Sequence, residues 1–214
     1  MPNNDRVMRS NRAAEIHKLI KTYNEDGMGV LHALQKDNIQ NSWGARKNLK
    51  KGIGFKVEIE LVLEKDFKAL IFSDSGTHGL TGTKFKNLEE EAATLGIDFQ
   101  NPNERLANFE NHLNRGRDRD QITGGFVGQG KLVSNIHSDN YKVYYDSLRE
   151  DGEYLVNNRY FNPPDLNVDH MEYKLGTVSW GKDANKELDN FSNGHLNPLN
   201  EVGTRIIIMN PNDD

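Results

Sequence analysis

The stretch Phe55-Lys56-Val57-Glu58-Ile59-Glu60-Leu61-Val62-Leu63 alternates apolar with charged side chains along most of its length. Successive side chains of a β-strand point to opposite faces, so a period of two predicts a strand with one buried face. The turn at residues 64–66 leads into a second apolar run, Lys68-Ala69-Leu70-Ile71-Phe72. Two such runs joined by a short polar turn predict an antiparallel hairpin. The hairpin makes a β-sheet the centre of the expected fold.

Two stretches with helical spacing precede the hairpin. Within residues 11–23, apolar side chains recur at intervals of three and four, at Ile16, Leu19, Ile20 and Tyr23. This spacing predicts an amphipathic helix. A second helix is expected over about residues 30–49, because the glycine-containing segment 26–29 separates it from the first.

The rest of the chain predicts more strands than helices. Short helices are expected at 88–95 and near 105–113, and another opens within 131–137. Strands are expected at 141–148, 154–161, 173–180 and 203–209, the first two as a hairpin. Residues 181–202 are polar and rich in asparagine, so they are expected to form a polar insertion or loop. This order predicts an α+β fold, a two-layer sandwich of helices on a mixed, mainly antiparallel sheet.

Composition restricts the class of protein. A chain of 214 residues is long enough for one substantial core. Its formal charge of −5 gives no support for a general nucleic-acid-binding surface. Cysteine is absent, which excludes disulfides and thiolate metal sites. Because there is no apolar run of about 18 residues and no signal-peptide core, a cytoplasmic protein without a membrane partner is expected.

A glycine-rich segment is the strongest indication of a ligand. It reads Ile122-Thr123-Gly124-Gly125-Phe126-Val127-Gly128-Gln129-Gly130-Lys131. Glycine carries no Cβ, so such a backbone can bring N–H groups close to phosphate oxygens. The segment approaches the P-loop pattern, but Leu132 stands where that motif has Ser or Thr, and charged residues precede it instead of a buried strand. A phosphate site of another kind is therefore favoured, and a P-loop enzyme remains an alternative.

Two further motifs carry oxygen ligands. Asp74, in Ser73-Asp74-Ser75-Gly76 at the end of the second strand, is placed to accept a hydrogen bond from a ligand amine, although this sequence is also common in turns. Asp37 and Asn41 are four residues apart and share one helix face. They can activate a water and hold Mg²⁺, or they can belong to a solvated helix face.

Together these motifs resemble those of the GHKL ATPase superfamily, which includes gyrase, heat-shock chaperones, MutL proteins and sensor histidine kinases. Residues 37–41 resemble its helical motif, an acid followed four residues later by Asn. Asp74-Ser75-Gly76 resembles its adenine-binding Asp-x-Gly, residues 123–130 resemble its phosphate-binding lid, and Gly203-Thr204 resembles its last motif. The resemblance covers nearly the whole chain in the right order.

The resemblance implies a Bergerat fold, with one ATP-binding domain over residues 1–214, a lid at about 75–130 and the polar insertion at about 181–202. The implied ligands are ATP and Mg²⁺. The implied ATP-binding residues are Asn41, Ala45, Asp74, Gly76, Gly79, Thr81, Gly125, Phe126, Val127, Gly128, Gln129, Gly130, Lys131 and Thr204.

The resemblance also implies individual roles. Asp74 would accept the adenine amino group, supported by Thr204, and Asn41 would ligate the magnesium that bridges the phosphates. Backbone N–H groups of 126–130 would bind the β- and γ-phosphates, with Lys131 adding a charge. Asp37 would be the catalytic residue, acting as general base on the attacking water.

Departures from the family pattern shape the expected function. Asp37 stands where the family usually has Glu and is one methylene shorter, Gly44 stands where many relatives have an acid, and Gly79 is one residue further from Gly76 than usual. The expected activity is that of a slow Mg²⁺-dependent ATPase, coupled to lid closure and to homodimerisation or partner switching. The chain is expected to act with a further domain or protein partner. The alternatives are a non-hydrolysing nucleotide-sensing module and a histidine-kinase-type phosphotransfer domain.

Overall fold

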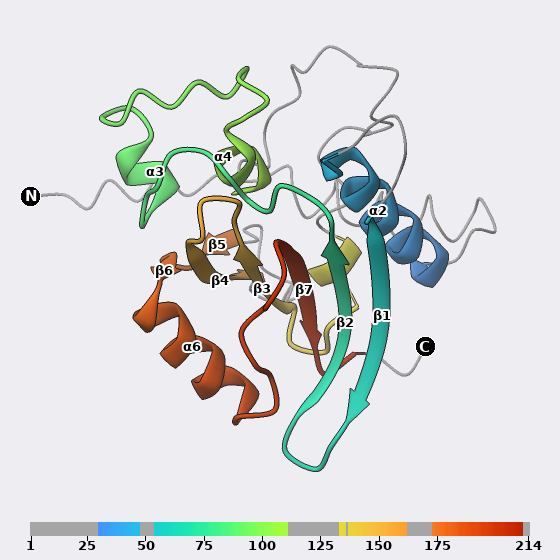
Figure 1. Ribbon diagram of the computed structural model, residues 1–214. Helices are drawn as coiled ribbons and strands as arrows, with labels where there is room; N and C mark the ends of the chain where they lie inside the picture. The colour runs from blue at the N-terminus through green and yellow to red at the C-terminus, as the bar shows by residue number, and fades with distance from the viewer. Residues whose placement is uncertain (1–29, 48–53, 111–132, 136, 162–172, 212–214) are drawn as a thin grey trace, which may run out of the picture.

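The computed structural model describes residues 30–47, 54–110, 133–135, 137–161 and 173–211 (Figure 1). The helices are α2 (Val30–Ala45), α3 (Leu88–Glu91), α4 (Arg105–Glu110) and α6 (Lys182–Ser192). The strands are β1 (Lys56–Leu63), β2 (Lys68–Ser75), β3 (Lys142–Leu148), β4 (Tyr154–Phe161), β5 (Tyr173–Leu175), β6 (Ser179–Trp180) and β7 (Gly203–Met209). The helix expected at 11–23 and the glycine-rich segment 122–131 lie outside the described residues.

All the strands join one sheet in the order β1-β2-β7-β3-β4-β5, and β6 also pairs with β4. Both predicted hairpins, β1–β2 and β3–β4, are confirmed. The strand expected at 173–180 is split into β5 and β6, which pair with different parts of β4. Every pairing between described strands is antiparallel. The mixed sheet that the sequence predicts is therefore not found among these strands. The C-terminal strand β7 lies between β2 and β3, which explains its apolar sequence.

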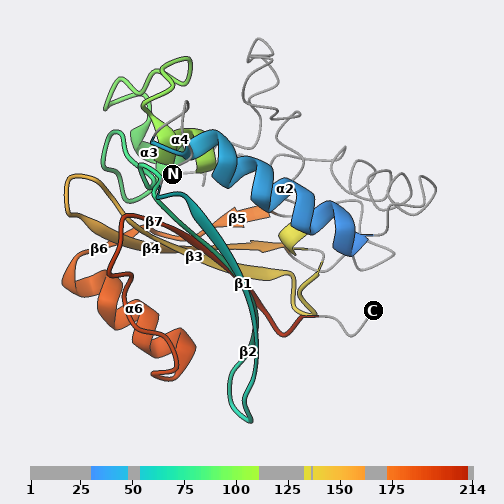
Figure 2. The ribbon, with the colours of Figure 1, turned by 45° about the vertical axis from the view of Figure 1, so that its right-hand side comes forward.

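Neighbouring side chains of the sheet enter different core layers. Tyr145 and Ile208 pack on the side of α2, α3 and α4, whereas Tyr144 and Ile207 pack on the other side. Figure 2 shows α2, α3 and α4 over one face of the sheet and α6 under the other. The molecule therefore has three layers, and the expectation of a two-layer sandwich is wrong.

The third layer comes from the segment that was expected to be a polar loop. Residues 182–192 form α6, whose Ala184 and Leu188 are buried against Tyr154 and Val156. The apolar residues recur at helical spacing, but the asparagine-rich sequence between them hides the pattern. After α6, Leu196 and Leu199 continue the packing, so the end of the insertion also lies on the sheet.

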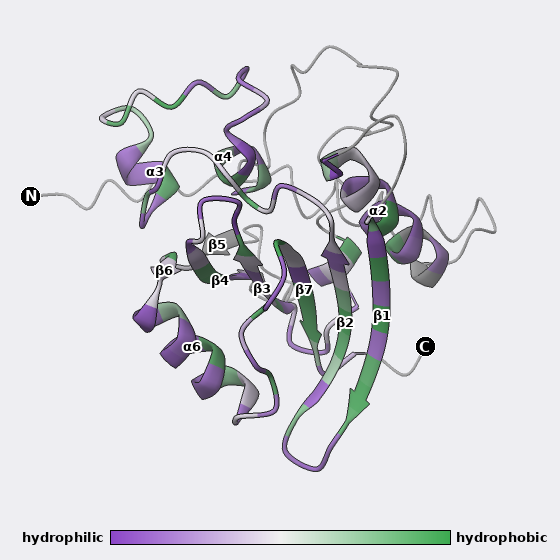
Figure 3. Ribbon diagram, in the orientation of Figure 1, coloured by the Kyte–Doolittle hydropathy of each residue, from purple (hydrophilic) through white to green (hydrophobic). Residues whose placement is uncertain are grey.

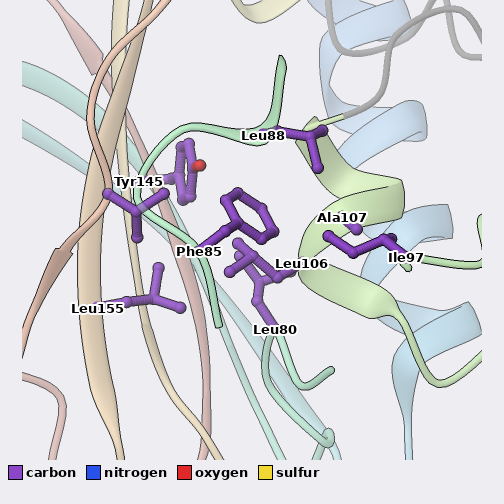
Figure 4. Packing of buried hydrophobic residues seen from close by; sticks show 9 residues of the cluster. Leu80, Phe85, Leu88, Ile97, Leu106, Ala107, Tyr145 and Leu155 are labelled. Atoms are coloured by element: carbon purple, nitrogen blue, oxygen red, sulfur yellow. The ribbon is translucent and has the colours of Figure 1, made fainter. Parts of the chain in front are cut away.

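Residues 80–107, which include α3 and the start of α4, pack on one face of the sheet. Figure 4 shows their apolar side chains converging on Tyr145 and Leu155. The buried members of this segment are Leu80, Phe85, Leu88, Ile97, Leu106 and Ala107. Within the expected lid, the buried residues between 80 and 107 are thus packed into the core.

The first strand differs from its prediction in burial. Its alternating pattern predicts a buried face, yet Ile59, Leu61 and Leu63 are exposed. The reason is position: β1 lies at an edge of the sheet, and α2 packs through Leu34 on Phe72 and Ile208 of the next two strands. Within the described residues, no helix is long and apolar enough to cross a bilayer.

Candidate functional site

Asp74 lies near the end of β2, where the sheet meets the start of β7 and the C-terminal part of α2. Its carboxylate accepts three hydrogen bonds from three different segments. The Oδ1 atom accepts from Thr77 Oγ1 at 2.7 Å and from the backbone N–H of Thr204 at 3.0 Å. The Oδ2 atom accepts from Ser42 Oγ at 2.8 Å. A carboxylate has about four acceptor positions, so the donors among the described residues leave one position on Oδ2 for a further donor.

Burial is the main influence on the ionisation of this carboxyl. Removal from water raises the pKa of Asp74, and the hydrogen bonds from Thr77, Ser42 and Thr204 oppose that shift in part. A carboxylate that is held by donors yet short of solvation gains from one more donor. The arrangement therefore suits a ligand that presents an N–H group.

Three glycines around Asp74 have no room for a side chain. A Cβ on Gly203 would lie 1.9 Å from the Asp74 carbonyl oxygen, and one on Gly76 would lie 2.0 Å from the carbonyl oxygen of Gly54. Gly79 would meet the Leu148 carbonyl oxygen at 2.5 Å. Gly76 and Gly79 also have positive φ angles of 72° and 64°, which L-residues rarely adopt. Glycine is thus required by packing at all three positions.

The end of α2 is attached to the turn that follows β2. Arg46 and Thr77 form an isolated antiparallel bridge. The N–H of His78 donates to the Ala45 carbonyl at 3.2 Å, and the N–H of Lys47 donates to the Gly76 carbonyl at 3.0 Å. The helix that carries Ser42 and the turn that carries Thr77 are therefore held in one arrangement around Asp74.

Thr204 contributes a hydroxyl as well as its backbone N–H. Ser147 Oγ donates to the Gly203 carbonyl at 2.7 Å and accepts from the Leu80 N–H at 2.9 Å. Thr204 Oγ1 lies 3.2 Å from the same Ser147 oxygen. Because Ser147 has one hydroxyl hydrogen, Thr204 is the donor in this pair. Its own oxygen is left as an acceptor next to Asp74.

The two helical candidates lie further along α2. Asn41 lies on the line of the helix that includes the buried residues Leu34 and Asn38, yet Asn41 itself is exposed. The sheet-facing side of α2 is therefore open to solvent at this level. Asp37 is half-buried one turn earlier. Neither residue joins the hydrogen-bond network of Asp74 among the interactions described.

The remaining predicted residues fall into two groups. Thr81 is half-buried, and its carbonyl accepts from the N–H of Leu106, which fixes the start of α4. The phosphate-binding candidates Gly125, Phe126, Val127, Gly128, Gln129, Gly130 and Lys131 lie outside the described residues. The structure thus brings together Asp74, Gly76, Gly79, Ala45 and Thr204.

Three polar residues of the site were not predicted as binding residues: Ser42, Thr77 and Ser147. Ser42 follows Asn41, and Thr77 follows Asp74 by three residues, a spacing that suits a side-chain hydrogen bond within a turn. Thr77 could therefore have been found from its neighbour Asp74, whereas the bond from Ser42 depends on how α2 packs against the turn after β2. Ser147 has no sequence signal, because only the pairing of β3 with β7 brings it beside Thr204.

An exposed ionic cluster lies close to the site. Glu150 contacts His78 Nδ1 at 2.6 Å and Lys47 Nζ at 3.2 Å. The hydrogen bond from His78, with a smaller effect of Lys47, lowers the pKa of Glu150. Its members come from the end of α2, the turn after β2 and the β3–β4 turn, so the cluster joins three segments next to the site.

The described residues contain no group of three or more His, Cys, Asp or Glu side chains that could hold a metal ion. Magnesium commonly keeps several waters and takes only one or two protein ligands beside phosphate oxygens. The exposed amide of Asn41 fits that mode, not a site built by the protein alone. No family model matches the chain, and no curated protein matches it.

Proposed function

We propose that this chain is a GHKL-type ATP-binding domain of the Bergerat fold, in which Asp74 recognises the adenine amino group. The observation that carries the proposal is the Asp74 carboxylate, to which three donors of the described residues leave one acceptor position. The adenine amino group supplies the missing donor, and the hydroxyl oxygen of Thr204 lies beside it.

Magnesium and the phosphates belong on the α2 side of the site. The amide oxygen of Asn41 would ligate Mg²⁺ together with phosphate oxygens and waters, and the ion would neutralise charge on the phosphates. The N–H groups of residues 126–130 and the ammonium group of Lys131 would bind the β- and γ-phosphates. Asp37, one turn from Asn41, would orient the attacking water and accept its proton.

Calorimetric titration with a non-hydrolysable ATP analogue, with and without Mg²⁺, tests binding directly. We expect saturable binding that Mg²⁺ strengthens. Asp74→Asn should weaken binding severely, because the carboxamide presents a donor or a weaker acceptor to the adenine amino group. Lys131→Ala should have the smaller effect. The reverse order of the two effects would support a P-loop site and contradict the proposal.

The base can be tested separately from the phosphates. Inosine triphosphate carries a carbonyl oxygen in place of the adenine amino group and would face the Asp74 carboxylate with an acceptor. A hydrogen bond to a charged group contributes about 1.5–3 kcal/mol, so we expect roughly 10- to 100-fold weaker binding than for ATP. Equal affinity for the two nucleotides would remove Asp74 from base recognition.

Hydrolysis depends on Asp37. Asp37→Asn should keep ATP binding and lose phosphate release, because the carboxamide cannot accept the proton of the water. Asp37→Glu restores the longer acid of the related family and should raise turnover. If phosphate release is the same in all three proteins, Asp37 is not the base. The second candidate, a non-hydrolysing nucleotide sensor, is favoured by the short side chain of Asp37 and predicts binding without turnover in the wild type.

A further inference from the structure

Exposed apolar side chains gather at one edge of the sheet. Six large hydrophobic side chains are exposed in the described part of the chain, and five of them belong to α2 and β1. These five, here called the edge stripe, are Ile39, Trp43, Ile59, Leu61 and Leu63. Such a concentration is unlike the scattered single residues of an ordinary surface.

The β1 residues of the edge stripe lie on one face of the sheet. In the register with β2, Ile59 pairs with Phe72 and Leu61 with Leu70, so these side chains stand on the face that α2 covers further inward. The exposed fraction rises along the strand, from 47% at Ile59 to 56% at Leu61 and 67% at Leu63. Figure 3 shows hydrophobic segments alternating with hydrophilic ones along β1, at the edge of the sheet.

The α2 part of the stripe joins the β1 part through an aromatic contact. The rings of Trp43 and Phe55 meet edge to face, with centroids 5.5 Å apart, next to the first residue of β1. Figure 1 shows α2 beside β1. The two elements therefore present a single angled surface, with the helix on one side and the strand on the other.

Charge argues against a second copy pairing along this edge. Glu58 and Glu60 alternate with the apolar residues of β1 and are exposed. An antiparallel pair of two β1 strands centred on Ile59 would bring Glu58 of each strand opposite Glu60 of the other, which is destabilising. A segment that packs on the apolar face, without adding a strand to the sheet, fits the surface better.

We propose that residues 11–23 dock on the edge stripe as an amphipathic helix, alongside α2. Their apolar side chains Ile16, Leu19, Ile20 and Tyr23 fall on one helix face. A helix of this length is about 20 Å long, which compares with about 26 Å for the eight residues of β1. The link from Tyr23 to Val30, the first residue of α2, spans at most about 24 Å.

The absence of cysteine allows a direct test by cross-linking. Leu19→Cys is combined in turn with Ile59→Cys, Leu61→Cys or Leu63→Cys in the full chain, and each protein is oxidised. We expect at least one pair to form a disulfide within a single chain at several times the yield of its control. The matched control replaces Leu19→Cys with Lys18→Cys, which lies on the opposite face of the predicted helix.

A footprinting measurement complements the cross-links. Hydroxyl-radical labelling of Trp43 and Leu61 should increase in Ile20→Asp and stay unchanged in Lys18→Asp. Cross-links no more frequent than in the control, or disulfides that join two chains, would overturn the proposal. Unchanged labelling of the edge stripe in Ile20→Asp would overturn it as well. These readouts need no nucleotide, so their outcome is separate from that of the proposed ATP binding.

Discussion

At the scale of single residues, the candidate site depends on glycines that packing does not allow to be replaced by residues with a side chain. Gly76→Ala should destabilise the protein by more than the roughly 1–2 kcal/mol that a left-handed conformation costs an L-residue, because its Cβ would also meet the Gly54 carbonyl oxygen. Gly152→Ala is the matched control, since its φ is also positive but nothing lies within 4 Å of the added carbon. Urea unfolding of both variants measures the difference. Equal costs would mean that the close approach at Gly76 is not rigid.

Asp74 should give the protein a characteristic pH dependence. Its folded-state pKa is raised by burial, so the folded protein binds this proton more tightly than the unfolded chain. The corresponding stability is fully present below the unfolded pKa, near 3.9, and is lost as the pH rises through the folded value. The unfolding free energy of the wild type should therefore fall relative to Asp74→Asn over this window. Urea unfolding at a series of pH values tests it, and a constant difference would contradict it.

At the scale of elements, α6 is held to the sheet by a few apolar side chains. Leu188 is almost completely buried among Tyr154, Val156 and Ala184. Leu188→Ala should reduce the free energy of unfolding by about 2–5 kcal/mol, because it leaves a cavity between helix and sheet. Asn190→Ala, at an exposed position of the same helix, should change it by no more than about 0.5 kcal/mol. Similar values for the two variants, measured by chemical unfolding, would show that α6 is not part of the folded core.

The elements also show what could be predicted from the sequence. β1, β2, β3, β4 and β7 are recognisable from alternation or from continuous apolar runs, because these patterns are local. α6 was not predicted, because its few buried positions are separated by asparagine and charged residues. Their helical spacing becomes evident only when the sheet on which they pack is known. The exposure of β1 was missed for the related reason that an edge strand and an inner strand can share one pattern.

At the scale of the whole molecule, a buried ion pair connects several parts of the chain. Arg205 donates from two guanidinium nitrogens to Asp146, with Nε at 2.9 Å from Oδ1, and also to the Asn197 carbonyl. Tyr154 donates its hydroxyl to the same carboxylate. Burial alone would lower the pKa of Arg205, but the charge of Asp146 outweighs it and raises the pKa. Burial and then Asp146 raise the pKa of Tyr154.

This network predicts a strongly non-additive pair of substitutions. Asp146→Leu alone should cost about 3–5 kcal/mol, because it leaves the Arg205 charge buried without its partner. The double variant Asp146→Leu/Arg205→Met should recover much of that loss, since no unpaired charge remains. A double-mutant cycle from urea unfolding measures the coupling. Additive losses in the double variant would show that the pair is solvated and contributes little.

Only part of the candidate site could be predicted from the sequence, because some of its residues form short motifs and others meet only in the folded chain. Asp74, Gly76 and Thr204 stand out in sequence because their motifs are short and continuous. Ser147 and Gly54 become part of the site through strand pairing and turn packing, which no short motif records. The contribution of Ser42 required knowing that α2 ends against the turn after β2.

The covering of both sheet faces has a consequence for how copies or partners of this protein can be stacked. A face-to-face sandwich with another sheet would require α6, or the α2, α3 and α4 layer, to be displaced together with its buried side chains. Over the described surface, this leaves contacts through the helices or along the β5 border, since Glu58 and Glu60 disfavour pairing along β1. A partner that stacks on either sheet face would therefore meet helices and not the strands themselves.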